Sequence, residues 1–170
     1  MQRTGWLRMR RIAAYAALVA AALVVLAGVL TARARQADDQ REAEQGVLAA
    51  SAEMARAGEA MDADRLFAMM LDTDKGSVIQ NGVFMATREE ALRQVKTGFE
   101  RVSKVEYRWK RQHVTVLSPG VALLTAEGES LATIADGRVI ATPFAQSVVF
   151  ILRDGKWKAL HAHQSSPPRG

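Results

Sequence analysis

Residues 105–164 read VEYRWKRQHVTVLSPGVALLTAEGESLATIADGRVIATPFAQSVVFILRDGKWKALHAHQ. The stretch is rich in β-branched and aromatic residues, and three pairs interrupt it: Pro119 with Gly120, Asp136 with Gly137, and Asp154 with Gly155. Such pairs are typical of tight turns between strands. The pattern therefore predicts an antiparallel meander of four long strands. Their predicted ranges are 105–117, 121–134, 139–153 and 156–164.

The residues before this stretch show helical periodicity. Apolar residues recur every three or four positions over 40–61, and Asp62 is a suitable N-cap for a short second helix. Asn81 and Gly82 predict a hairpin turn between short strands at 77–80 and 83–86. A capping box at residues 87–90 then opens a helix that extends to about residue 102. Helices gathered before an antiparallel sheet predict an α+β fold in which the sheet curls around them.

The N-terminus has the composition of an export signal. Residues 12–30 carry no charge, and four arginines precede them. A secretory signal has an apolar region of roughly 7–15 residues, whereas a spanning helix needs about 20, so an uncleaved anchor is slightly favoured over a cleaved peptide. We expect either an inner-membrane anchor with the domain in the periplasm, or a secreted chain if residues 1–32 are removed. The predicted organisation is a signal anchor or signal peptide at 1–32, a flexible linker at 33–41, a domain at 42–166 and a tail at 167–170.

Composition excludes several classes of protein. The chain has no cysteine, which removes disulfides, thiolate metal sites and a cysteine nucleophile. Its net charge of +5 comes mostly from the four N-terminal arginines, so the domain has no basic excess of the kind that nucleic acid requires. No phosphate-binding loop, dinucleotide fingerprint or nucleophile elbow is present. We therefore expect no cofactor and no nucleic-acid partner.

Several short motifs carry a family resemblance over residues 42–167. They are MDADRL at 61–66, Asn81 with Gly82, RDGKWK at 153–158 and HAHQS at 161–165. The chain resembles the NTF2-like superfamily, in particular its SnoaL-like and DUF4440-type branches. The closing hairpin is also similar to the calcium/calmodulin-dependent kinase association domain, although Gln164 stands where that domain has an arginine.

The resemblance implies a cone-shaped curved sheet packed on about three helices, with a pocket between the layers, usually in a dimer. Some such proteins catalyse isomerisation, cyclisation, dehydration or epoxide hydrolysis, and others only bind or assemble. Fold alone does not decide between these activities.

The last strand carries the candidate chemistry. His161 and His163 are two residues apart, so regular strand alternation places them on one face together with Trp157 and Ala159. Either histidine is a candidate general acid or base, because its pKa lies near neutrality. The competing interpretations are that both rings are structural, or that they begin a metal site. A metal site would need a third ligand from His113, Glu127 or Glu129, and we expect none.

Two functional hypotheses follow. The first is a module that binds a small amphipathic ligand or assembles with partners, without established catalysis. Its pocket would be lined by the helix methionines Met54, Met61, Met69 and Met70 and by Tyr107, Gln146, Trp157, His161 and His163. The alternative is a small isomerase, cyclase or hydrolase with His163 or His161 as general base. If side chains fill the cavity, a purely structural module remains.

Strand 139–153 also suggests a partner. Phe144, Val148 and Phe150 alternate with Ala145, Val149 and Ile151, so the strand is apolar on both faces. Such a strand is covered on both sides. We expect the helices to cover one face and a second copy of the chain to cover the other, in a homodimer.

Overall fold

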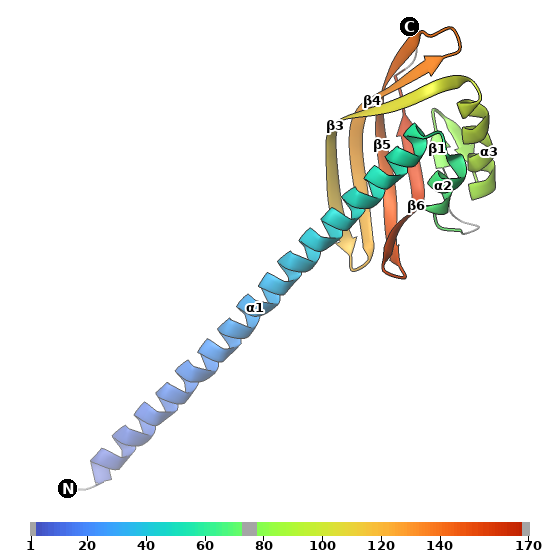
Figure 1. The fold of residues 1–170 in the computed structure, drawn as a ribbon. Coiled ribbons are helices and arrows are strands. Elements are labelled where there is room, and N and C mark those ends of the chain that lie inside the picture. The colour runs from blue at the N-terminus through green and yellow to red at the C-terminus, as the bar shows by residue number, and fades with distance from the viewer. Residues whose placement is uncertain (1–2, 73–77, 168–170) are drawn as a thin grey trace. The chain divides into compact units, whose positions relative to one another are not determined.

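The computed structural model describes residues 3–72 and 78–167, with side chains from residue 28 onward. The chain divides into two compact units, Met1–Arg41 and Glu42–Gly170. Helix α1 spans Arg3–Glu59 (Figure 1). Residues 33–41 are helical, in contrast to the predicted flexible linker. They contain no glycine or proline and are rich in arginine, alanine and glutamine, which favour a helix.

Parts of the predicted organisation fall outside the described residues. The predicted anchor at 12–30 lies mostly where side chains are not described, and most of the predicted tail at 167–170 also lies outside the described residues. Among the described residues, no helix combines the length and the apolar character that a membrane crossing requires. Export and anchoring therefore stay predictions.

The second unit contains a curved six-stranded sheet with the order β2-β1-β6-β5-β4-β3 (Figure 1). All neighbouring strands are antiparallel except β1 and β6, which are parallel. The four-stranded meander is confirmed, and the short hairpin adds two strands beyond β6. The strands are β1 (Val78–Gln80), β2 (Val83–Met85), β3 (Val102–Ser118), β4 (Val121–Ile134), β5 (Val139–Arg153) and β6 (Lys156–Ser165).

The turn and cap residues adopt the expected conformations. Asn81 and Gly82 both have positive φ, 50° and 82°, as a two-residue turn between β1 and β2 requires. The Asp62 side chain accepts a hydrogen bond from the Arg65 backbone N–H at 2.9 Å and caps α2 (Ala63–Ala68). The Thr87 hydroxyl accepts from the Glu90 N–H at 3.1 Å and caps α3 (Arg88–Phe99).

The core lies between the helices and one face of the sheet, which confirms the α+β class. We call this the cavity face and the opposite one the outer face. Val47 of α1, Phe67 of α2 and Ala91 of α3 are buried against the sheet residues Leu124 and Phe150. Helix α2 is joined to α3 where the Arg88 Nε donates to the Phe67 carbonyl oxygen at 2.9 Å.

Four register shifts occur in the described sheet, three on β3 and one on β6, and two of them are β-bulges that reverse the side-chain alternation beside the cavity. On β6, Val149 pairs with His161 and Phe150 pairs with Ala159, which leaves Leu160 as an extra residue. On β3, Lys110 is the extra residue in the same way, between Trp109 and Arg111. Each bulge moves the residues beyond it to the other face of the sheet.

Candidate functional site

A cavity of about 380 Å³ lies between the cavity face and the helices of the second unit. Side chains from all three helices and from five of the six strands, all except β2, line it. Most of the lining is apolar. The apolar members include Met54, Leu66, Phe67, Met70, Val78, Val95, Phe99, Val105, Val148, Phe150 and Ala162. The cavity is therefore not filled by side chains, and its walls and size suit a small organic molecule.

An aromatic cluster forms the wall at β3 and β5. The rings of Trp109 and Phe144 meet edge to face with centroids 5.4 Å apart, and those of Tyr107 and Phe144 do so at 6.3 Å. Gly128 of β4 lies beside these rings. A Cβ at Gly128 would stand 2.6 Å from the Arg108 carbonyl oxygen and 3.2 Å from Phe144 Cζ, so only glycine fits between the rings and the neighbouring backbone.

Tyr107 is held between this cluster and the end of α1. Its backbone N–H donates to the Glu59 carboxylate at 3.0 Å, and its hydroxyl oxygen would lie 3.1 Å from a Cβ on Gly58. Burial, followed by the negative charge of Glu59, raises the pKa of Tyr107 above its ordinary value of 10.0. Near neutral pH the phenol is therefore protonated and can donate a hydrogen bond.

Four glutamines line the cavity: Gln94 lies on α3, and the other three form a polar wall on the sheet. Gln80 on β1 is paired with Gln164 on β6, and Gln164 is paired with Gln146 on β5. All three side chains line the cavity. The Gln80 Nε2 donates to the Gln164 Oε1 at 3.3 Å. We call these residues the glutamine row.

The ionisable groups of the lining are few. Among the described residues that line the cavity, Tyr107 is the one titratable side chain, and no Asp, Glu, His, Lys or Arg is present. The remaining polar side-chain groups are the glutamine amides, the indole N–H of Trp109 and the hydroxyls of Ser51 and Ser130. This wall can accept and donate hydrogen bonds, but near neutral pH it offers no group that readily exchanges a proton.

The residues predicted to line the pocket separate into two groups. Tyr107 and Gln146 line the cavity, whereas Trp157, His161 and His163 are not among its lining residues. Trp157 packs on the helical side of the sheet against Gly46, where a Cβ would stand 2.6 Å from its Nε1. Of the predicted methionines, Met54 and Met70 line the cavity and Met61 and Met69 do not.

The bulge at Leu160 explains why His161 and His163 do not face the cavity. Regular alternation would put His161 and His163 on the same face as Trp157 and Ala159, and that prediction is wrong. Ala159 is fully buried in the core, while His163 lies on the outer face. The structure therefore does not support either histidine as a general base for a ligand in this cavity.

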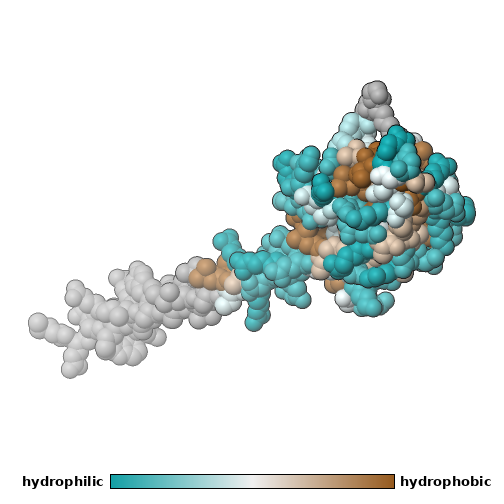
Figure 2. Space-filling view, turned by 45° about the horizontal axis from the view of Figure 1, so that its top comes forward, coloured by the Kyte–Doolittle hydropathy of each residue, from teal (hydrophilic) through white to brown (hydrophobic). Residues whose placement is uncertain are grey.

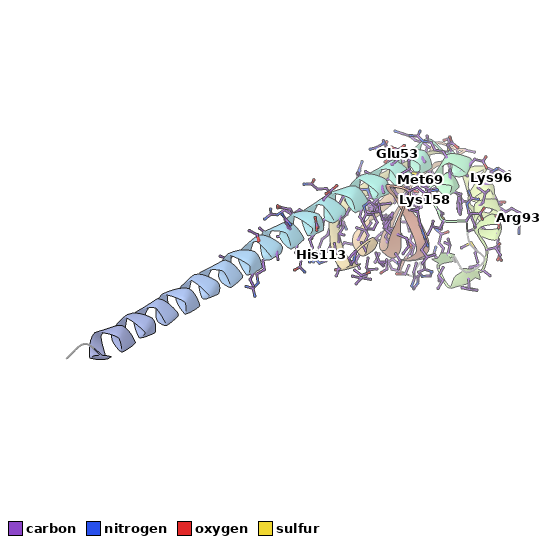
Figure 3. All side chains as sticks on the ribbon, turned by 90° about the horizontal axis from the view of Figure 1, so that it is seen from below. Glu53, Met69, Arg93, Lys96, His113 and Lys158 are labelled. Carbon is purple, nitrogen blue, oxygen red and sulfur yellow. The ribbon has the colours of Figure 1, made fainter. Side chains whose placement is uncertain are left out.

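A shallow hollow of about 560 Å³ lies on the outer face of β3 to β6. His113, Thr125, Ser147 and His163 occupy consecutive positions across its four strands. Beside them Arg111 forms an ion pair with Glu127 at 2.9 Å, and most of these side chains are exposed. Figure 3 shows His113 on the other side of the domain from Arg93 and Lys96 of α3.

The metal alternative has no support in the part of the chain that the structure describes. There, no three His, Asp or Glu side chains lie close enough together to hold a metal ion. His113 and His163 are separated by two intervening strands, and Glu127 is engaged by Arg111.

The sequence pattern did not identify Gln80, Gln164 or Gly128 as parts of the site. A strand pattern assigns residues to faces only while alternation is unbroken, and Gln164 and Gly128 both lie near a bulge. Gln80 lines the cavity because β1 is paired with β6, a contact between distant parts of the chain.

A family model described as the SnoaL-like domain matches residues 47–169. No curated protein is significantly similar in sequence. Several solved structures share the fold at low identity. A protein of the NTF2-like family from Streptomyces avermitilis, thought to be a dehydratase, is 20% identical with a TM-score of 0.69, over 76% of this chain and 99% of that one.

Two further structures extend the comparison. Hexachlorocyclohexane dehydrochlorinase LinA-type3 from Novosphingobium barchaimii is 14% identical with a TM-score of 0.65, over 76% of this chain and 90% of its own. A protein from Xanthomonas campestris is proposed to be a calcium/calmodulin-dependent protein kinase II association domain. It is 17% identical with a TM-score of 0.65, over 73% of this chain and 87% of that one. These likenesses establish the cone-shaped fold and leave the activity open.

Proposed function

The chain belongs to the SnoaL-like domain family, and from that premise we propose that it binds a small amphipathic molecule in the cavity between sheet and helices. The observation that carries the proposal is the cavity of about 380 Å³ with apolar walls, an aromatic cluster and a row of amides. Small-molecule sites combine mostly apolar walls with a few placed polar groups in this way.

Binding is favoured over acid–base catalysis by the lining. A general base must lie within hydrogen-bond reach of the substrate and have a pKa near the working pH. Tyr107 is the titratable group among the described lining residues, and burial raises its pKa further from neutrality. The proteins described as a dehydratase and a dehydrochlorinase are each under 25% identical to this chain. Their described activities therefore assign no catalytic role to any of its residues.

Figure 2 shows hydrophobic side chains reaching the surface among hydrophilic ones on the visible face of the second unit. We propose that one apolar patch, on the outer face, forms a homodimer interface. Val121 pairs with Ile151 and Leu123 pairs with Val149, and all four are half-buried. The same patch on a second copy would cover them, as a two-fold interface requires. The uncharged segment at 12–30 supports the further proposal that the domain is exported and anchored through it.

Native mass spectrometry of the full-length chain, purified from its own source, tests the binding proposal. A retained small molecule is expected, and it should be lost when Ala162→Leu fills part of the cavity. Ala162 lines the cavity, whereas Ala141 is exposed on β5, so Ala141→Leu is the matched control. Retention that is equal in both variants would show that the molecule binds elsewhere, and consistently ligand-free protein would argue against the proposal.

A further inference from the structure

The polar and apolar groups of the cavity lie at different places along the sheet. The glutamine row occupies β1, β6 and β5, and the rings of Trp109 and Phe144 occupy β3 and β5. Because neighbouring strands are about 4.8 Å apart, the row extends over about 10 Å. Gln146 and Phe144 are two residues apart on the same face of β5, so the row and the rings meet there. On its sheet side, the cavity thus has one amide wall and one aromatic wall.

The glutamine row retains hydrogen-bonding capacity. The Gln80 to Gln164 bond uses one N–H of the first amide and the oxygen of the second. Each amide has two N–H donors and one carbonyl acceptor, so donors and an acceptor remain at the row. Within the described residues, the Gln146 side chain makes no hydrogen bond to another residue, and it lines the cavity half-buried. A ligand that offers both an acceptor and a donor would satisfy it.

The same wall disfavours a charged ligand. Burial of a charge costs far more than burial of a hydrogen-bonded neutral group unless an opposite charge is present. None of the described lining residues carries a charge near neutral pH. An amide offers a dipole to a carboxylate or an ammonium, but no counter-charge.

We propose that the cavity selects an uncharged molecule that has an apolar, ring-containing body and an amide-like edge, with a donor and an acceptor side by side. The ring packs against Trp109 and Phe144, and the edge binds Gln146 and the adjacent Gln164. This inference rests on the proposed binding function and adds the chemical class of the ligand.

Three probes with one ring system test the selection: 2-naphthamide, 2-naphthoate and 2-isopropylnaphthalene. Equilibrium dialysis against the full-length chain gives the dissociation constant of each. The solution is kept free of detergent, because detergent would compete for an apolar cavity. The amide is expected to bind at least about tenfold tighter than the carboxylate, since only the carboxylate loses its hydration without a counter-charge.

The variant Gln146→Leu keeps a side chain of similar size and removes the amide. It is expected to weaken 2-naphthamide about tenfold and to leave 2-isopropylnaphthalene within about twofold, because only the amide probe loses a hydrogen bond. Gln112→Leu is the matched control, since Gln112 is exposed on β3 and does not line the cavity. Gln164→Met provides a second test if thermal melting shows that Gln146→Leu is unfolded.

The possible outcomes separate the two proposals. If the carboxylate or the hydrocarbon binds as tightly as the amide, or if Gln146→Leu binds 2-naphthamide like the unmodified chain, the selection is overturned while the binding function stands. If none of the three probes binds, both are overturned.

Discussion

The indole of Trp157 lies directly against Gly46, and a Cβ on Gly46 would stand 2.6 Å from Nε1 and 2.7 Å from Cδ1. Alanine normally favours a helix over glycine by about 1 kcal/mol. Here the added methyl group must displace a ring that packs against the core, and overpacking costs about 1–3 kcal/mol. We therefore expect Gly46→Ala to lower the free energy of unfolding by about 1 kcal/mol, measured by urea denaturation.

Gly98 provides the matched control for that experiment. It also lies in a helix, α3, but a Cβ there meets no atom within 4 Å. Gly98→Ala should therefore raise the free energy of unfolding by about 0.5–1 kcal/mol, through helix propensity alone. Equal effects of the two substitutions would contradict the close packing of α1 on β6.

The buried phenol predicts a loss of stability at high pH. Burial and Glu59 raise the pKa of Tyr107 in the folded chain above the value of about 10 expected in the unfolded chain. The protonated phenol of Tyr107 therefore contributes its full stabilisation below pH 10. This stabilisation is lost as the pH rises from there through the pKa of the folded chain, because the phenol then loses its proton. Thermal melts from pH 8 to 11 should show this loss.

The variant Tyr107→Phe isolates the effect, because the chain has one other tyrosine, Tyr15. The part of the pH-dependent loss that belongs to Tyr107 should disappear in the variant, while the losses shared with lysine titration should remain. Identical pH profiles for the two chains would show that Tyr107 is not buried in this way.

The cap of α2 gives a local test of the fold. The Asp62 side chain accepts the Arg65 N–H at 2.9 Å, so Asp62→Ala should reduce the free energy of unfolding by about 1 kcal/mol. Asp64 lies in the first turn of the same helix and forms an exposed ion pair with Lys96, and Asp64→Ala should cost under about 1 kcal/mol. Similar losses in chemical denaturation would mean that Asp62 is not the cap.

The fold could be predicted because its signals are local. Asn81 with Gly82, Asp62 and Thr87 each act within a few residues, and the structure has them as a turn and two N-caps. The order of helices and strands follows from these signals and from periodicity. Residues 33–41 are helical where a flexible linker is predicted, because their polar residues also have high helix propensity.

The site could be predicted only in part, because the bulges at Lys110 and Leu160 determine which strand residues face the cavity. The turn at Asp154 and Gly155, followed without interruption, would pair Gln146 with His163. The extra residue Leu160 shifts the pairing by one, so that Gln164 lies opposite Gln146. A pocket with histidine and a pocket with paired amides thus differ by one residue of register, which no local pattern fixes.

The apolar patch on the outer face of β4 and β5 predicts a dimer that one charge can disrupt. If a second copy covers Leu123 and Val149, a lysine at Val149 would place an unpaired ammonium in an apolar interface. Analytical ultracentrifugation should show that the full-length chain is a dimer at micromolar concentration and that Val149→Lys weakens association at least about 30-fold, as loss of a central interface contact does. Val83→Lys is the control, because Val83 is an exposed valine on β2, away from the patch. This interface would be excluded if the parent chain were a monomer, or if Val149→Lys and Val83→Lys weakened the dimer equally. The half-buried residues of β4 and β5 would then face solvent.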